Sequence, residues 1–183
     1  LNEAFDDSTA KRSNLLLSLV FKQLYEGPFV TIAAVQGAAI AGGAGLMSAC
    51  NFAIATNDAQ FGYPEVKRGL VPAQVMVFLK KQLRERDLLE LLLLGETIDA
   101  KKALSIGLIN NCVEEKQLMK EAINLAERLL KCAPNAINKT KELLNRLTGN
   151  ITTDLEKMRI EGELMRKTPE AKEGMQAFFN DCT

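Results

Sequence analysis

Two features of the sequence could act together chemically: a group of glycines at positions 42, 43 and 45, and a carboxylate at Glu65. Glycines let backbone N–H groups approach a bound group closely, and a helix starting beside them aims its unpaired N–H donors the same way. An enzyme that stabilises an enolate needs such donors at the oxyanion and a base near the acidic C–H. From spacing alone, however, the favoured interpretation of Glu65 is a surface or helix N-terminal acid.

The glycines belong to a stretch from Phe29 to Cys50 that contains no charged residue. Its first part, 29–35, is a β-branched apolar run that predicts a buried strand, and the glycine-rich part predicts a tight turn followed by a short helix through 46–50. Three alternatives remain open: a bilayer span, a turn whose glycines only permit close packing, and a nucleotide phosphate loop. Pro28 and the glycines disfavour the span, and the glycine spacing disfavours the phosphate loop.

The rest of the chain alternates strands with helices and then becomes helical. Strand, helix and strand in so few residues predict a parallel crossover. Asp99 has the position of a helix N-cap. The patterns predict further strands at 52–55, 59–61 and 108–113, and helices at 12–26, 73–83, 84–94, 100–106, 115–131, 134–147, 152–165 and 169–178.

Composition narrows the function. A chain of 183 residues at 47% hydrophobic can bury a core as one domain, and its net charge of zero provides no basic field for nucleic acid or an anionic membrane. The absence of histidine excludes Ser-His-Asp and Cys-His nucleophile systems and removes the commonest transition-metal ligand. Four scattered cysteines, and a first ten residues without a signal-peptide pattern, indicate an intracellular protein.

Residues beside Glu65 offer weaker candidates. Lys67 and Arg68 could meet a phosphate, although adjacent basic residues are more typical of a solvated edge. Tyr63 is predicted to be a packed aromatic residue rather than an acid. The leucine-rich stripe at 88–94 is predicted to be core or an oligomer interface rather than a lipid site.

The order of these segments resembles the signature of the crotonase (enoyl-CoA hydratase/isomerase) superfamily. The resemblance extends over essentially the whole chain and reaches the closing helices around Lys139-Thr140-Lys141 and Glu173-Gly174. The segments that carry it are Ile32–Gly37, Ala41–Leu46, Cys50–Ala55, Ala59–Phe61, Pro64-Glu65, Gly69–Pro72, Ile98–Ala100 and Gly107–Ile109.

This resemblance implies an α/β fold with a ββα spiral core and a C-terminal helical layer, and acyl-CoA thioesters as substrates. It reverses the interpretation of Glu65, which becomes the general base, and makes the Gly42 N–H an oxyanion donor. Coenzyme A then enters as part of the substrate, and neither a separate cofactor nor a metal is expected. The implied substrate-binding residues are Gly43, Gly45, Pro64 and Leu70.

Two departures from the family pattern affect the expected reaction. Hydratases of this family carry a second glutamate at the position that matches Gly45. A single base that shuttles a proton between C2 and C4 therefore fits better, which favours a Δ3,Δ2-enoyl-CoA isomerase. A hydratase, a lyase, a decarboxylating member and a catalytically silent acyl-CoA-binding protein remain alternatives. The resemblance also implies that a second oxyanion donor precedes Leu1, so we expect the chain to lack the family's N-terminal part.

The resemblance also suggests how the chain is organised. We expect residues 1–113 to form the remnant of the crotonase core and residues 114–183 to form a helical region for oligomerisation. Assembly as a homotrimer or a dimer of trimers would follow. The family implies the cytoplasm or an organelle matrix as the compartment, the mitochondrion or peroxisome in a eukaryote.

Overall fold

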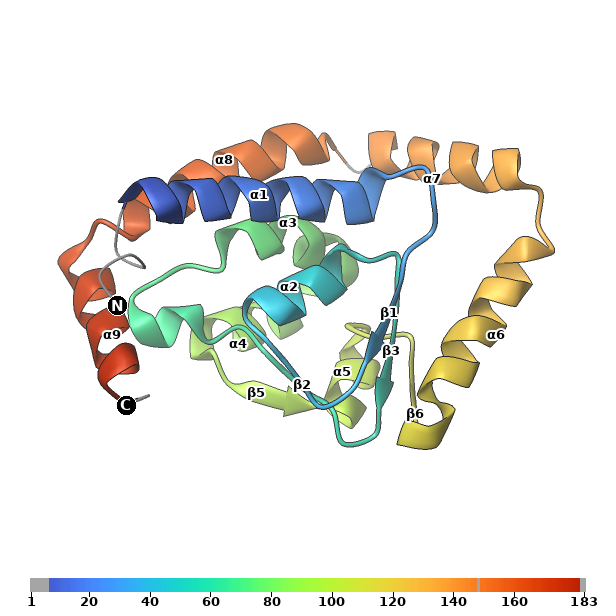
Figure 1. Ribbon diagram of the computed structural model, residues 1–183, viewed down its shortest axis with the longest axis horizontal. Helices are drawn as coiled ribbons and strands as arrows, with labels where there is room; N and C mark the ends of the chain where they lie inside the picture. The colour runs from blue at the N-terminus through green and yellow to red at the C-terminus, as the bar shows by residue number, and fades with distance from the viewer. Residues whose placement is uncertain (1–6, 148, 182–183) are drawn as a thin grey trace.

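A computed structural model describes residues 7–147 and 149–181 (Figure 1). Helix α1, Asp7–Glu26, leads into the strands, and helices alternate with short strands as far as residue 113. The other helices are α2 (Gly42–Ala49), the 3-10 helix η2 (Pro64–Arg68), α3 (Ala73–Gln82), α4 (Glu85–Leu94), α5 (Ala100–Ile106), the 3-10 helix η3 (Glu115–Gln117), α6 (Leu118–Leu130), α7 (Pro134–Leu147), α8 (Ile151–Met165) and α9 (Pro169–Asp181).

The first sheet is entirely parallel and holds β1 (Ile32–Val35), β3 (Phe52–Thr56) and β6 (Asn111–Val113) in the order β1-β3-β6. Ala33 pairs with Ala53, and Ile54 pairs with Asn111. Strand β3 lies in the middle and is buried from its second residue on, which explains its continuous apolar sequence. The parallel pairing of β1 with β3 across α2 confirms the predicted crossover.

The second sheet was only partly predicted. It holds β2 (Ala38–Ile40), β4 (Gln60–Gly62) and β5 (Thr97–Asp99), with β2 parallel and β5 antiparallel to β4. The sequence indicated β4 but neither β2, which lies in the Gly- and Ala-rich stretch that predicted a turn, nor β5, which ends at the N-cap residue Asp99. The uncharged stretch 29–50 is therefore not a bilayer span but two strands and a helix. Among the described helices, none is long and apolar enough to cross a membrane.

The helix boundaries agree closely with the sequence patterns. Helices α5 and α7 begin and end where predicted, and most others differ by one to three residues. The exceptions are α1, which begins five residues before position 12, and α2, which begins four residues before position 46, so the predicted glycine turn is in fact the first turn of α2. Asp99 caps α5 as expected, since its Oδ1 accepts a hydrogen bond from the Lys102 N–H at 2.7 Å. Asn150 caps α8 in the same way by accepting from the Thr153 N–H at 3.1 Å.

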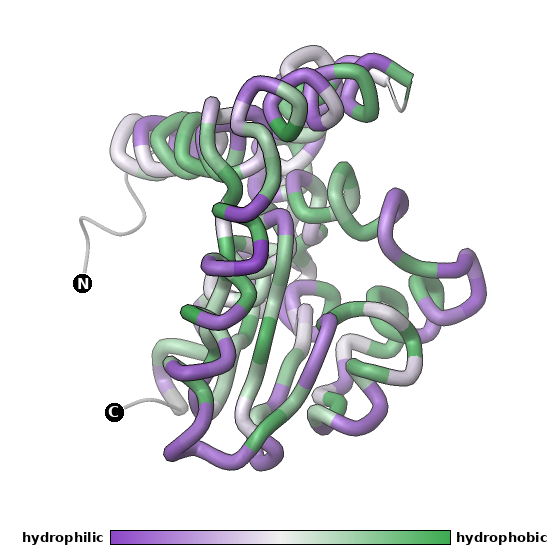
Figure 2. The backbone as a smooth tube through the Cα atoms, turned by 90° about the vertical axis from the view of Figure 1, so that its right-hand side faces the viewer, coloured by the Kyte–Doolittle hydropathy of each residue, from purple (hydrophilic) through white to green (hydrophobic). Residues whose placement is uncertain are grey.

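A single large hydrophobic cluster joins the early helices to α8. Phe21 of α1 meets Phe78 of α3 edge to face at 5.7 Å, and Ile151 and Leu155 of α8 are fully buried in the same cluster. Hydrophobic residues follow the central strands, whereas hydrophobic and hydrophilic residues alternate along the surrounding helices (Figure 2). Helix α8 therefore belongs to the same core as the strands, whereas an oligomerising role for residues 114–183 stays a prediction.

Candidate active site

The start of α2 presents backbone N–H groups that no side chain caps. Ala41, which precedes the helix, has φ 51° and ψ −118°, and its N–H donates to the Gly62 carbonyl at 2.9 Å. The first bond of the helix runs from the Gly45 N–H to the Ala41 carbonyl. The N–H groups of Gly42 and Gly43 thus lie in the first turn, where donors lack partners within the helix and the helix dipole favours negative charge.

The residue with positive φ at this turn is an alanine and not one of the glycines. Ala41 is the one non-glycine residue with positive φ in the described chain. Neither Gly42 nor Gly43 has a positive φ, and a Cβ at either position would meet nothing within 4 Å. Backbone conformation and packing within the described chain therefore do not require these glycines. Their bare backbone leaves room for a bound group to approach the N–H donors.

Glu65 lies in the 3-10 helix η2, which Pro64 begins and Gly69, in the left-handed conformation, ends. The Glu65 carbonyl accepts a hydrogen bond from the Leu70 N–H at 3.0 Å, so its backbone is fixed. Its side chain is half-buried, and the oxygen Oε2 is buried without a hydrogen-bond partner among the described residues. Burial raises the pKa of this carboxyl, while its own backbone N–H and the Arg68 charge oppose the shift. A carboxyl with a raised pKa suits proton exchange.

Gly42 and Glu65 meet at one cavity of about 320 Å³. The cavity lies between the start of α2, η2, the start of α3, and the facing sides of α1 and α8. Leu70 lines it as well, so the structure brings three of the predicted site residues together. Glu65 is the only carboxylate among the described residues that line the cavity. An N–H donor and a single acid therefore share one small compartment.

The other three predicted contacts are not among the residues that line this cavity. Gly43 is exposed next to Gly42, and Pro64 begins η2. Gly45 is buried beneath α1 and α3, where a Cβ would lie 2.8 Å from Phe21 Cζ and 2.7 Å from Val75 Cγ1. With these neighbours in place, a glutamate at position 45 has no room.

A buried hydrogen bond ties α2 to the segment that carries Glu65. The Tyr63 hydroxyl lies 2.6 Å from Ser48 Oγ, and Ser48 Oγ donates to the Ala44 carbonyl at 2.9 Å. Tyr63 is fully buried, as predicted for a packed aromatic, and burial raises the pKa of its hydroxyl. Ala44 lies two residues after Gly42, and Tyr63 lies two residues before Glu65. The sequence did not indicate this link between the donor and the acid.

Sequence reasoning also missed the arginines of α8 at the cavity. Arg159 and Arg166 line it, together with Arg68 from η2 and Gln74 from α3. Arg159 and Arg166 are seven residues apart and so share one helix face, a spacing visible in the sequence. The proximity of that face to Glu65 depends on packing between distant segments. Of the two basic residues considered beside Glu65, Arg68 lines the cavity and Lys67 does not.

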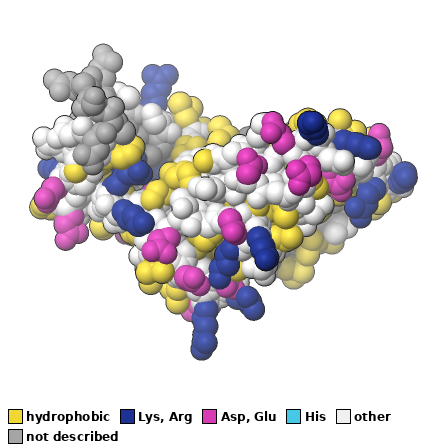
Figure 3. All heavy atoms as spheres, turned by 90° about the horizontal axis from the view of Figure 1, so that it is seen from below, with side chains coloured by type: hydrophobic (Ala, Val, Ile, Leu, Met, Phe, Trp, Pro, Cys, Tyr) yellow, Lys and Arg dark blue, Asp and Glu magenta, His cyan; other side chains and the backbone are white. Residues whose placement is uncertain are grey.

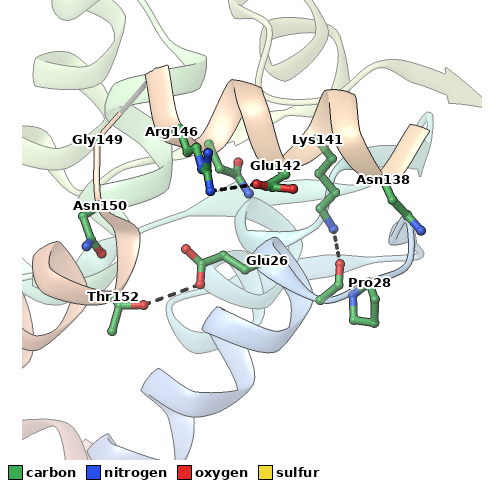
Figure 4. A pocket seen from close by; sticks show the side chains of 11 residues that line it. Glu26, Pro28, Asn138, Lys141, Glu142, Arg146, Gly149, Asn150 and Thr152 are labelled. Atoms are coloured by element: carbon green, nitrogen blue, oxygen red, sulfur yellow. Dashed lines mark hydrogen bonds and ion pairs between the residues drawn. The ribbon is translucent and has the colours of Figure 1, made fainter. Parts of the chain in front are cut away.

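A second cavity, of about 740 Å³, lies between the end of α1, α7 and the start of α8 (Figure 4). Its charged groups already have partners. Lys141 Nζ donates to the carbonyls of Gly27 and Phe29 at 2.9 and 2.7 Å, and Arg146 pairs with Glu142 at 3.0 Å. This cavity holds none of the predicted site residues. On the face seen in Figure 3, basic and acidic side chains are interspersed.

Comparison with known proteins shows the family to which the chain belongs. Residues 2–182 match the family described as enoyl-CoA hydratase/isomerase, and the chain belongs to that family. A Thermus thermophilus protein provisionally named an enoyl-CoA hydratase is 38% identical over 169 residues, which cover 92% of this chain and 67% of that protein. A crotonyl-CoA hydratase of Syntrophomonas wolfei is 33% identical over 175 residues, covering 93% of this chain and 66% of that protein.

Solved structures agree with this assignment. An enoyl-CoA hydratase from Mycobacterium avium superposes with a TM-score of 0.86 at 28% identity, covering 96% of this chain and 69% of the other. A carnitinyl-CoA hydratase from the same species is 37% identical, with a TM-score of 0.77 over 84% of this chain and 61% of the other. These matches confirm the crotonase-type fold that the sequence predicted. The chain spans 52% to 67% of the length of the relatives it matches.

Proposed function

We propose that the protein processes acyl-CoA thioesters through an enolate that the Gly42 N–H stabilises. Family membership supports the substrate class, since relatives of this chain are named as hydratases and dehydratases of CoA thioesters. The shared cavity of Gly42 and Glu65 supports the enolate. A thioester oxygen at the start of α2 would receive an N–H donor and the positive end of a helix dipole.

Within that class we propose Δ3,Δ2-enoyl-CoA isomerisation, with Glu65 as the only base. The observation that carries this choice is the single carboxylate in the cavity, combined with the packing of Phe21 and Val75 over Gly45. Glu65 would take a proton from C2 of a 3-enoyl thioester, leaving the electron pair delocalised onto the thioester oxygen. It would then return the proton to C4 as the double bond moves to C2. No water enters, so no second carboxylate is needed.

The Glu65→Gln variant tests this proposal, because glutamine keeps the shape and removes the base. We expect conversion of 3-hexenoyl-CoA to the 2-enoyl product to fall by about 100-fold or more, the usual contribution of a general base. Glu127→Gln, an exposed acid on α6, is the matched control and should retain activity. Turnover retained in the Glu65 variant would contradict the role of Glu65.

Hydration is the second candidate, because the relatives compared above are named as hydratases. Measuring water addition to crotonyl-CoA beside isomerisation separates the two reactions, since faster hydration would require a water-positioning group other than residue 45. A silent acyl-CoA-binding protein is the remaining alternative. Calorimetry that shows acyl-CoA binding while both assays show no turnover would favour it.

We also propose that the chain assembles as a homotrimer or a dimer of trimers. The support is apolar surface on helices that are covered on one side only. Leu130 at the end of α6 is 81% exposed, and Leu147 at the end of α7 is 84% exposed. Exposed apolar patches of this kind mark interaction sites. Light scattering gives the mass in solution, and a monomer would count against the assembly.

A further inference from the structure

The residues that line the cavity include three arginines. Arg68, Arg159 and Arg166 all line it, and Glu65 is the only acid that does so among the described residues. Burial already disfavours the ionised form of Glu65 by raising its pKa. The cavity is therefore a basic compartment, although the whole chain has no net charge. A purely hydrocarbon acyl group would leave this charge unused.

The three arginines differ in how the chain satisfies them. Arg159 donates to both oxygens of Glu156, at 3.0 and 2.7 Å, and is also paired with Glu163, so its charge is neutralised. The Arg68 guanidinium lies over the Phe178 ring, 3.8 Å from its centre, which holds the group in place without cancelling its charge. Arg166 forms no ion pair or side-chain hydrogen bond with any residue the structure describes. Its five donors are available to a ligand.

One amide that lines the cavity has an oxygen without a partner in the described chain. Gln74, in the first turn of α3, lines the same cavity, and its Oε1 is buried without a hydrogen-bond partner among the described residues. Its Nε2 makes only a long contact, 3.4 Å, to the Asn14 carbonyl. The amide nitrogen carries two N–H donors and the Asn14 carbonyl accepts from only one of them, so Gln74 can also donate to a ligand. An amide with an unused donor and a guanidinium without an ion pair in the described chain, both lining one cavity, are suited to binding a polar group.

The size of the cavity indicates which part of an acyl-CoA that group belongs to. At about 320 Å³ the cavity is at the small end of ligand sites, and it already contains Gly42 and Glu65, where the reacting thioester would lie. The phosphates of coenzyme A are a pantetheine arm away from the thioester. An anion that reaches Arg166 inside this cavity would therefore be carried on the acyl group.

We infer that the acyl group of the substrate is short and ends in a carboxylate, which Arg166 binds, with Gln74 donating to it and Arg68 adding positive charge. This inference rests on the proposed function, because it assumes that a thioester occupies the Gly42 side of the cavity. It narrows that function from acyl-CoA thioesters in general to monothioesters of short dicarboxylic acids. Arg166 is then a specificity-determining residue and takes no part in proton transfer.

The test compares two saturated ligands of equal length in a calorimeter with the full chain. Glutaryl-CoA and pentanoyl-CoA both have five-carbon acyl groups, differ only in the terminal carboxylate, and have no double bond to isomerise. We expect glutaryl-CoA to bind about tenfold tighter or more, as for a hydrogen-bonded charge pair. Arg166→Met, which keeps the apolar stem, should bring the two dissociation constants within about twofold of each other.

Two controls keep the result interpretable. Arg86→Met, on the exposed side of α4, removes the same charge elsewhere and should leave the preference unchanged. Arg166→Lys keeps the charge but loses the forked geometry, so it should retain an intermediate preference. Urea unfolding of Arg166→Met shows whether the variant is folded.

Equal binding of the two ligands by the unaltered chain would overturn the inference, as would a preference that survives in Arg166→Met. A loss of affinity in Arg166→Met that is equal for glutaryl-CoA, pentanoyl-CoA and free coenzyme A would assign the arginine to the phosphates and overturn the acyl assignment. Each of these results leaves the proposed function intact. If neither thioester binds, the proposed function fails and the inference fails with it.

Discussion

Helices α7 and α8 are neighbours in sequence and both carry apolar residues at helical spacing, yet the structure uses them differently. Leu155 of α8 is 2% exposed and packs in the main core against the early helices. Leu147 of α7 is 84% exposed, and no residue of α7 is buried among those the structure describes. Figure 1 shows α8 lying along α1 above α3, whereas α6 and α7 extend to one side of the strands. One helix completes the candidate site, and the other leaves apolar surface uncovered.

The difference teaches that amphipathicity predicts a helix but not its partner. Periodicity indicates that a helix has an apolar face, while the surface that covers the face depends on the rest of the chain or on another chain. In α8 the covered face carries Ile151 and Leu155, and the same helix brings Arg159 and Arg166 to the cavity. In α7 the apolar face is a candidate interface.

The largest effect is expected when a core leucine of α8 is shortened, and an exposed leucine of α6 provides the comparison. Leu155→Ala should lower the free energy of unfolding by about 2 to 5 kcal/mol, because it deletes buried methyl groups and leaves a cavity. Leu130→Ala, at a position 81% exposed, should change the free energy by no more than about 0.5 kcal/mol for the isolated chain. Urea denaturation followed by circular dichroism measures both values. Similar losses in both variants would refute the contrast between α8, which is part of the core, and the helices α6 and α7, which expose apolar surface.

The same contrast exists within α2, between two glycines. Gly45→Ala should cost about 1 to 3 kcal/mol of unfolding free energy, because the added Cβ would overlap Phe21 and Val75. Gly43→Ala, in open space, should be neutral or stabilising by up to about 1 kcal/mol, as expected for alanine replacing glycine in a helix. Urea denaturation of the two variants side by side measures both free energies of unfolding. A tolerated Gly45→Ala would mean that the neighbours can move, and would restore room for a second carboxylate.

Sequence reasoning predicted the helices, the parallel crossover and the pairing of Gly42 with Glu65 in one cavity, because local periodicity and family resemblance carry that information. It did not predict the strands β2 and β5, which are three residues long, or the positive φ at Ala41. It also missed the Ser48 to Tyr63 hydrogen bond and the arginines of α8 at the cavity. Each of these depends on contacts between residues far apart in the chain, for which one sequence gives no local signal.

Glu65 should also make the stability of the fold depend on pH. Burial raises the folded-state pKa of Glu65 above its ordinary value of 4.5, so the fold favours the protonated form. The contribution of protonated Glu65 to the free energy of unfolding is complete below that ordinary value and is lost as pH rises through the folded-state pKa. Glu65→Gln should therefore gain thermal stability relative to the unaltered chain at pH 7 but not at pH 4. All other titratable groups are the same in the two proteins, so the difference in their thermal stability reports on residue 65. If Glu65→Gln were more stable by the same amount at pH 7 and pH 4, burial of the carboxylate would not be the cause.

The smallest effect on folding is expected in α7, where a substitution should change assembly instead. Leu147→Gln replaces a side chain that is 84% exposed, so the unfolding free energy measured in dilute solution should stay within about 0.5 kcal/mol of the unaltered value. If α7 forms the proposed interface, the same change buries a polar amide between chains and should shift the mass in light scattering toward the monomer. Glu127→Gln, exposed on α6, is the control for a change of surface polarity. An unchanged mass in Leu147→Gln would show that the apolar face of α7 takes no part in the assembly, and the contrast with α8 would then concern folding alone.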